Sequence, residues 1–131
     1  MESAYLFGVD VLQNRIMNDR DAVMFDIDDT LISSDGTPIQ LMIDLAREAK
    51  ELGYQVILMT ARPAYENNIV WTLEQLKILE IPYSVLYFCN PLAKGHLKMK
   101  LGLNFILSVG DLETDLTNTD HWINTSNGYY S

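Results

Sequence analysis

The sequence predicts an α/β domain in which a central parallel β-sheet is covered by helices on both faces. Short apolar runs alternate along the chain with longer segments whose apolar residues recur every three or four positions. The short runs are typical of buried strands, and the longer segments are typical of amphipathic helices. Strands joined by helices in this way form right-handed crossovers onto a parallel sheet. Ligands bind such sheets beyond the carboxyl ends of the strands.

The first half of the chain alternates helix and strand. Residues 4–17 carry apolar residues at near-helical spacing, which predicts a short helix within an N-terminal helical appendage of residues 1–20. Residues 22–27 are apolar on both faces until an aspartate breaks the run, as expected of a central strand. The segment 38–52 opens on a proline, keeps an apolar stripe and stops before a glycine, which predicts a helix. The apolar run QVILMT at 55–60 predicts the second strand.

The second half repeats this alternation. The segment 63–79 also opens on a proline and predicts a helix. The apolar residues that keep the helical period of this segment are Tyr65, Ile69, Leu73, Leu76 and Leu79. The run YSVLYF at 83–88 predicts a third strand, 92–101 predicts a short helix that a glycine ends, and FILSV at 105–109 predicts a fourth strand. The weaker run HWIN at 121–124 is a candidate fifth strand.

Length and composition favour one domain in a reducing compartment. The chain has 131 residues and no linker divides it, so we expect one domain over 1–131 that finishes in a polar tail, 126–131. No apolar run approaches the roughly 20 residues of a membrane span, and the start lacks the basic region of a signal peptide, so we expect no membrane partner. The single cysteine, Cys89, cannot form an internal disulfide, which favours a cytoplasmic location. The net charge of −9 disfavours extended nucleic-acid binding but permits anionic substrates bound through a cation.

Three acids follow the first apolar run in the stretch AVMFDIDDTLI, residues 22–32. Residues two apart on a strand share a face, so Asp26 and Asp28 are predicted to point the same way. Ile27 turns away and leaves its backbone carbonyl as a further candidate metal ligand. Asp29 points elsewhere and is interpreted as a turn residue that bonds the backbone.

Small oxygen-bearing residues also end two other predicted strands. Thr60 ends the second strand and Asp111 follows the fourth, with Asp115 shortly after it. Because parallel strands end at one edge of the sheet, we expect these residues to gather near Asp26. Such an oxygen-only cluster is the ligand set that Mg²⁺ prefers, so the sequence predicts a magnesium site. Without the cation, repulsion should raise the pKa of at least one of these acids.

The same cluster suggests covalent phosphoryl chemistry. Asp26, fixed at the strand end, is placed to attack phosphorus and form an aspartyl-phosphate that water then cleaves. Asp28 can protonate the leaving oxygen and later take a proton from water. Thr60 can donate a hydrogen bond to a phosphoryl oxygen, and a lysine near the start of the helix at 92–101 would balance the charge. Both Lys94 and Lys98 are candidates, and spacing alone does not separate them.

At this point the chain resembles the haloacid dehalogenase-like (HAD) hydrolase superfamily. The segments DIDDT, VILMTARP, KGHLKMK and SVGDLETD appear in the family's order, and the resemblance covers about residues 22–125. It implies a three-layer Rossmann-like fold with strand order 5-4-1-2-3. It also implies a phosphatase that depends on Mg²⁺.

The family's first two motifs imply roles for residues after the first and second strands. The first motif would place the nucleophile at Asp26 and the general acid/base at Asp28, with Thr30 supporting the turn. The backbone carbonyl of Asp28 would be a metal ligand. The second motif falls on Thr60, and the residues after it are candidates for substrate contact, namely Ala61 and Arg62. A surface salt bridge is the alternative role for Arg62.

The third and fourth motifs imply the remaining site residues. The third falls on Lys94 or Lys98. The fourth, in its GDxxxD form, would make Asp111 a metal ligand and Asp115 its neighbour in the outer coordination shell. An alternative for Asp115 is an acid at a helix N-terminus, favoured by the helix dipole.

Only one helix and one strand fit between Asp26 and Thr60, and again between Thr60 and Lys94, so the chain has no room for a cap domain. We expect such an open site to accept bulky substrates or to borrow a lid from a second subunit of a homo-oligomer. Two closer resemblances compete. The segment GLNFILSVGDLETDL and the tail WINTSNGYY resemble class B and plant-type acid phosphatases. The segment TARPAYENNIVWTLEQLKILEIPYSVLYF resembles the phosphatase domain of phage polynucleotide kinases. The expected substrate is accordingly a phosphorylated small molecule or a phosphorylated nucleic-acid 3′ end. The alternative to an enzyme is a catalytically silent module that binds Mg²⁺ or phosphate.

Overall fold

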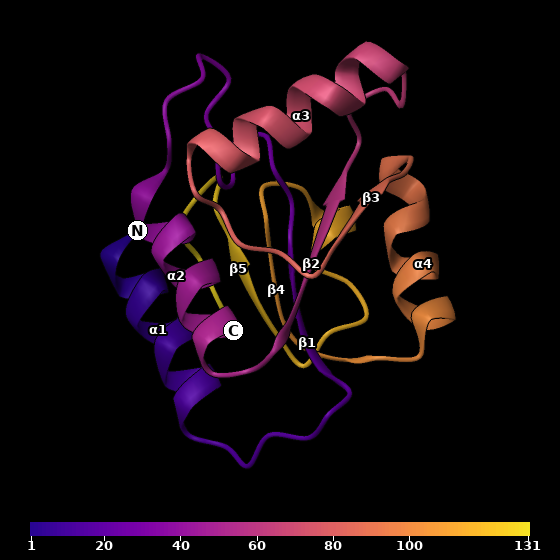
Figure 1. The fold of residues 1–131 in the computed structure, drawn as a ribbon. Helices are drawn as coiled ribbons and strands as arrows, with labels where there is room; N and C mark the ends of the chain where they lie inside the picture. The colour runs from indigo at the N-terminus through magenta and orange to yellow at the C-terminus, as the bar shows by residue number, and fades with distance from the viewer.

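The computed structural model describes residues 1–131 and contains one five-stranded sheet (Figure 1). All neighbouring strands pair in parallel, in the order β3-β2-β1-β4-β5. The strands are β1 (Asp21–Phe25), β2 (Gln55–Thr60), β3 (Val85–Phe88), β4 (Asn104–Gly110) and β5 (His121–Asn124). This order confirms the predicted fold class, and the weak fifth strand is confirmed as an edge strand beside β4.

Helices cover both faces of the sheet, as the apolar runs require. In Figure 1, α1 (Glu2–Gln13) and α2 (Gln40–Glu51) lie on one side and α4 (Lys94–Leu101) lies on the other. Helix α3 (Glu66–Ile78) lies across the top of the view, beyond the carboxyl end of β2. Two 3₁₀ turns, η1 (Pro91–Ala93) and η2 (Glu113–Asp115), complete the regular structure. None of the helices combines the length and the apolar character needed to cross a membrane.

Each face of the sheet has its own apolar cluster, because successive strand residues point to opposite faces. The larger cluster joins α1 and α2 to one face through residues such as Val23, Phe25, Leu58 and Val109. The smaller cluster lies on the face that α4 covers and comprises Ala22, Met24, Ile57, Met59 and Phe105. The central strand β1 is therefore buried on both sides, and its end is held rigidly.

Helix boundaries differ from the sequence prediction mainly at the N-termini. Helix α2 begins at Gln40 and not at Pro38, because Pro38 bridges to Ile32 in the preceding loop. The first helix ends at Gln13, and Ile16, which was predicted to lie in it, is 90% exposed.

Helix α3 shows the largest difference. It begins at Glu66, three residues later than predicted. Of its apolar stripe, Leu76 is buried, whereas Tyr65 is 72% and Leu73 41% exposed. The stripe is not buried as its period predicts, because α3 lies at the end of the sheet and contacts the rest of the protein over a narrow face that includes Thr72.

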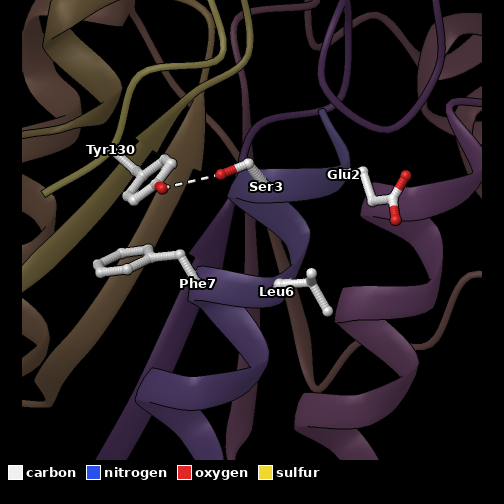
Figure 2. Close-up of a pocket in the computed structure, with 5 residues that line it drawn as sticks. All are labelled: Glu2, Ser3, Leu6, Phe7 and Tyr130. Carbon is white, nitrogen blue, oxygen red and sulfur yellow. Dashed lines mark hydrogen bonds between the residues drawn. The ribbon is translucent and has the colours of Figure 1, made fainter.

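The C-terminal tail packs against α1 and does not line the strand ends. Tyr130 stacks on Phe7 with ring centroids 4.5 Å apart, and its hydroxyl lies 2.8 Å from the Ser3 hydroxyl (Figure 2). Residues 129–131 also pair with β5 through backbone hydrogen bonds, such as that between Ser131 N–H and the Trp122 carbonyl. The tail thus covers part of the β5 edge, where unpaired backbone groups would otherwise remain.

Gly8 lets α1 approach α2 closely. A Cβ atom at this position would lie 2.8 Å and 2.9 Å from the two terminal carbons of Leu45, a fully buried side chain, and 3.2 Å from Ile123. These distances are shorter than van der Waals contact. The close approach therefore outweighs the cost of a glycine inside a helix, which is about 1 kcal/mol relative to alanine.

We expect Gly8→Ala to lower the free energy of unfolding by about 1 kcal/mol, because overpacking costs roughly 1–3 kcal/mol and exceeds the gain in helix propensity. In a Leu45→Ala background the same change should instead stabilise the protein, since the two closest contacts are gone and only the 3.2 Å approach to Ile123 remains. Urea unfolding of the four proteins in this cycle measures both effects. Stabilisation by Gly8→Ala in the wild-type background would contradict the proposed packing.

Candidate active site

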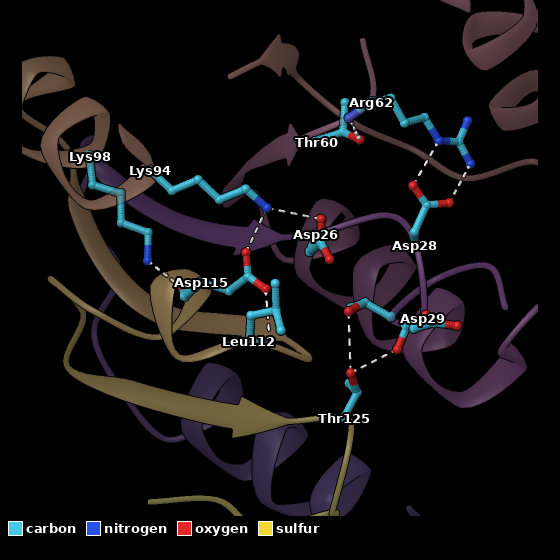
Figure 3. Close-up of polar contacts among 11 residues, drawn as sticks. Asp26, Asp28, Asp29, Thr60, Arg62, Lys94, Lys98, Leu112, Asp115 and Thr125 are labelled. Carbon is cyan, nitrogen blue, oxygen red and sulfur yellow. Dashed lines mark hydrogen bonds and ion pairs between the residues drawn. The ribbon is translucent and has the colours of Figure 1, made fainter. Parts of the chain in front are cut away.

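The predicted site residues lie at the carboxyl edge of the sheet (Figure 3). Asp26 directly follows β1, Thr60 ends β2 and Asp111 directly follows β4. Lys94 reaches them from the first turn of α4, and Asp115 from η2. The parallel topology therefore brings together residues that are up to 89 positions apart in the chain.

Lys94 is the cation at the centre of this cluster. Its ammonium lies 3.0 Å from Asp26 Oδ1 and 2.6 Å from Asp115 Oδ1. All three residues are buried: Lys94 is 2%, Asp26 6% and Asp115 0% exposed. Buried charges of this kind are tolerated only when they are paired and hydrogen-bonded. The two ion pairs meet that condition, and they raise the pKa of Lys94 against the opposing effect of burial.

Lys98, the other candidate for the third motif, lies one helical turn away and binds different partners. Its ammonium donates to Ser108 Oγ at 2.9 Å and to the carbonyls of Asp115 and Thr117, both at 2.7 Å. Burial lowers the pKa of Lys98 to about 7, but three acceptors need all three N–H groups of the ammonium. In the structure, Lys94 thus contacts the Asp26 carboxylate, whereas Lys98 binds the backbone of the segment after β4.

Asp26 is strongly perturbed. Burial raises its pKa to about 8; the charge of Asp115 and a hydrogen bond with Asp111 add to this rise, while Lys94 opposes it. One ammonium does not balance three carboxylates at close range. The site therefore has a deficit of positive charge that a bound cation would relieve.

The cluster fits the predicted metal. Asp26, Asp111 and Asp115 each offer a carboxylate oxygen, and these atoms lie within 4.8 Å of one another. An all-oxygen set suits a hard cation such as Mg²⁺. Both oxygens of Asp115 already have donors, since Oδ1 accepts from Lys94 and Oδ2 accepts from the Leu112 N–H at 3.2 Å. Asp26 and Asp111 are thus the better placed direct ligands, and Asp115 suits the outer shell.

Gly110 allows Asp115 to fold back over the end of β4. A Cβ atom at Gly110 would lie 2.3 Å from Asp115 Cβ and 2.4 Å from its Oδ2, which no side chain could accept. The glycine before Asp111 is therefore a steric requirement of the Asp115 position. This gives a physical reason for the GDxxxD spacing.

The structure turns Asp28 away from the metal cluster and toward Arg62 (Figure 3). Arg62 Nη2 lies 2.9 Å from Asp28 Oδ1, and its Nε lies 3.0 Å from Oδ2. The Asp28 side chain remains 50% exposed, whereas that of Arg62 is only 8% exposed. Arg62 thus forms an ion pair within the protein, which is the alternative to substrate contact that the sequence left open.

The turn after β1 is built by Asp29 and its neighbours. Asp29 has φ = 59°, a conformation that aspartate adopts more readily than most residues, and its Oδ1 accepts from the Ser34 N–H. Its carbonyl accepts from Thr125 Oγ1 at 2.9 Å, and the hydroxyls of Thr30 and Thr125 lie 3.2 Å apart. Asp29 therefore has the turn role that the sequence suggested, but no sequence pattern pointed to Thr125.

The second motif forms the turn after β2, beside Asp26 at the carboxyl edge of the sheet. Thr60 Oγ1 accepts from the Arg62 N–H at 3.1 Å, which tightens the turn after β2. Ala61 and Arg62 line a small surface pocket with Phe88 and Cys89 from the end of β3. The hydroxyl proton of Thr60 thus remains available for a substrate oxygen.

Comparison with known proteins agrees with this architecture. Residues 23–85 match the family described as haloacid dehalogenase-like hydrolase. A chain of the Pnkp1/Rnl/Hen1 complex has a TM-score of 0.64 and 18% identity, covering 79% of this chain and 43% of that one. The class C acid phosphatase from Bacillus anthracis with tungstate bound has a TM-score of 0.62 and 17% identity, covering 89% of this chain and 65% of that one. No curated protein matches.

At these identities the two structures show a shared fold, and the present chain spans less than two thirds of the length of either. The family match falls on the segment that holds the first two motifs. Together they confirm the resemblance to the haloacid dehalogenase-like hydrolases.

The raised pKa of Asp26 predicts that any stabilisation of the protein by Mg²⁺ depends on pH. Between its ordinary value of 3.8 and about 8, folded Asp26 holds a proton that the unfolded chain releases. The metal-free stability should therefore fall as pH rises through this window. Because Mg²⁺ needs the carboxylate, its stabilisation should be larger at pH 8 than at pH 5. Saturating Mg²⁺ should raise the melting temperature by several degrees at pH 8.

Thermal unfolding with Mg²⁺ or with EDTA at the two pH values measures this difference. Asp111→Asn should abolish the Mg²⁺ effect, whereas Asp120→Asn, which removes an exposed acid outside the cluster, should retain it. An equal effect of Mg²⁺ at both pH values would contradict the assigned titration.

Proposed function

We propose that the chain is a Mg²⁺-dependent phosphomonoesterase that works through an aspartyl-phosphate on Asp26. One observation carries the proposal: a buried carboxylate at the end of the central strand is bound to a lysine ammonium and lies within reach of two further acids. The strand holds Asp26 in place for in-line attack, and the surrounding charges suit a phosphoryl group.

The first step transfers the phosphoryl group to the enzyme. A carboxylate oxygen of Asp26 bonds to phosphorus while the ester P–O bond breaks. The leaving oxygen keeps the electron pair of that bond and receives a proton from the Asp28 carboxyl group. In the second step, water attacks phosphorus and gives a proton to the Asp28 carboxylate. The acyl phosphate P–O bond then breaks, which releases inorganic phosphate and restores the Asp26 carboxylate.

Lys94 and Thr60 assist from opposite sides. The Lys94 ammonium, 3.0 Å from Asp26, offsets negative charge that gathers around phosphorus, and the Thr60 hydroxyl donates to a phosphoryl oxygen. Asp26, Asp111 and the Asp28 backbone carbonyl would hold Mg²⁺, which would supply additional positive charge near the phosphoryl group. Asp115 keeps Lys94 in place through the 2.6 Å ion pair.

The open site supports a second candidate substrate, a 3′-phosphorylated nucleic-acid end. No inserted domain covers the edge of the sheet, so a bulky leaving group has access. The structural likeness to a chain of the Pnkp1/Rnl/Hen1 complex agrees with this alternative. Turnover of a 3′-phosphorylated oligonucleotide no faster than that of a mononucleotide would count against it.

Two further proposals concern whether the site is covered and in which compartment the enzyme works. We infer that the exposed edge is either left open to substrate or covered by a second copy of the chain. The free thiol of Cys89 is compatible with the reducing cytoplasm.

We expect Asp26→Asn to lower kcat for p-nitrophenyl phosphate with Mg²⁺ by on the order of 10³-fold or more, because the amide cannot attack phosphorus. Asp120→Asn, with its exposed acid, is the matched control and should keep wild-type activity. Trapping by beryllium fluoride, followed by ¹⁹F NMR, should be seen with the wild type and not with Asp26→Asn. Equal rates in the wild type and Asp26→Asn would exclude the mechanism.

A further inference from the structure

Arg62 is held on three sides by the protein, and Figure 3 shows its contact with Asp28. One edge of its guanidinium donates to both oxygens of Asp28, at 2.9 Å and 3.0 Å. Its Nη1 donates to Thr72 Oγ1 at 3.0 Å and to Gln75 Oε1 at 2.9 Å, both on α3. The guanidinium carbon also lies 4.8 Å from the ring centroid of Trp71.

This contact set fixes a side chain that is otherwise flexible. An arginine side chain has many rotamers, so a single surface ion pair seldom orders it. Here a bidentate pair, two further acceptors and an aromatic face act together on a side chain that is 8% exposed. Helix α3 therefore fixes the position of the guanidinium, and the guanidinium in turn fixes the position of the Asp28 carboxylate.

The arrangement leaves part of the Asp28 carboxylate accessible. Each carboxylate oxygen has two lone pairs, and Arg62 uses one on each oxygen. The Asp28 side chain is 50% exposed, so its remaining lone pairs are open to a substrate or water. The two bonds from Arg62 fix the orientation and the position of the Asp28 carboxylate.

We propose that Thr72 and Gln75 are positioning residues that act on Asp28 through Arg62 and thereby determine how well the enzyme cleaves esters with poor leaving groups. This inference rests on the proposed phosphatase function, in which Asp28 gives a proton to the leaving oxygen. It explains why α3, with few buried apolar residues, lies at the end of β2: its polar face holds Arg62.

Leaving groups separate this role from a structural one. An alkyl phosphate expels a strongly basic alkoxide and needs the proton from Asp28, whereas 2,4-dinitrophenyl phosphate expels a stable anion without it. A displaced general acid lowers kcat/KM, which reports the first step, for the alkyl ester alone, by part of the ~10²–10⁴-fold that such catalysis contributes. A general loss of folding or of phosphate binding would slow both.

The test compares kcat/KM for β-glycerophosphate and 2,4-dinitrophenyl phosphate in Gln75→Leu and Thr72→Val, with Mg²⁺ present. The ratio kcat/KM is used because kcat also contains the second step, in which Asp28 takes a proton from water whichever ester is cleaved. We expect each variant to lose on the order of 10-fold on the alkyl ester and less than about 3-fold on the aryl ester. Gln75→Glu keeps an oxygen acceptor for Arg62 and should retain activity on both esters. Gln55→Leu, which removes an amide at the start of β2 that bonds the Asp19 carbonyl, is the matched control and should lose neither.

A second measurement does not depend on activity. In the wild type, the Arg62 Nε–H should exchange slowly with water in ¹H–¹⁵N NMR spectra, and Gln75→Leu should accelerate this exchange while Gln75→Glu should not. Equal losses on the two esters, an increase on the alkyl ester, or unchanged Arg62 exchange in Gln75→Leu would overturn the inference. A wild type that hydrolyses neither ester would instead overturn the proposed function on which it rests.

Discussion

The ammonium of Lys94 is the interaction on which the rest of the site depends. It lies between the carboxylates of Asp26 and Asp115, at 3.0 Å and 2.6 Å, and both acids are buried, so solvent screens their repulsion only weakly. Removing one member of such a pair leaves an uncompensated buried charge, which typically costs about 3–5 kcal/mol. The same ammonium that lets the fold contain these acids also offsets the charge of a phosphoryl group, so stability and the proposed chemistry share one contact.

Helix α4 serves this interaction in two ways. Its apolar side, with Leu97 and Leu101, packs on the second face of the sheet. Its polar side places Lys94 at the acids, and Lys98 one turn later binds the backbone at Asp115 and Thr117. Both lysines are buried, but only one can contact the reacting carboxylate. The segment after β4 is thus tied to α4 at the point where it carries the proposed metal ligands.

The site is divided into a rigid half and an open half. Asp26, Lys94 and Asp115 form the buried half, where the sheet and α4 determine every position. Asp28 and Arg62 form the open half, where α3 provides the support. A nucleophile benefits from a fixed place, and a group that exchanges protons with substrate and water needs access. The division therefore suits the two roles proposed for Asp26 and Asp28.

The sequence alone determined the fold and the residues at the strand ends, because apolar runs mark the strands, and parallel strands bring Asp26, Thr60 and Asp111 to one edge. It could not separate Lys94 from Lys98, because residues four apart share one face of a helix and only packing decides which reaches Asp26. Nor could it find Thr72, Gln75 and Thr125, since a lone hydroxyl or amide belongs to no spacing pattern. The tertiary structure decided these contacts, and it also placed α3 at the end of the sheet, because polar contacts to Arg62 outweigh an apolar stripe that the helical period alone would bury.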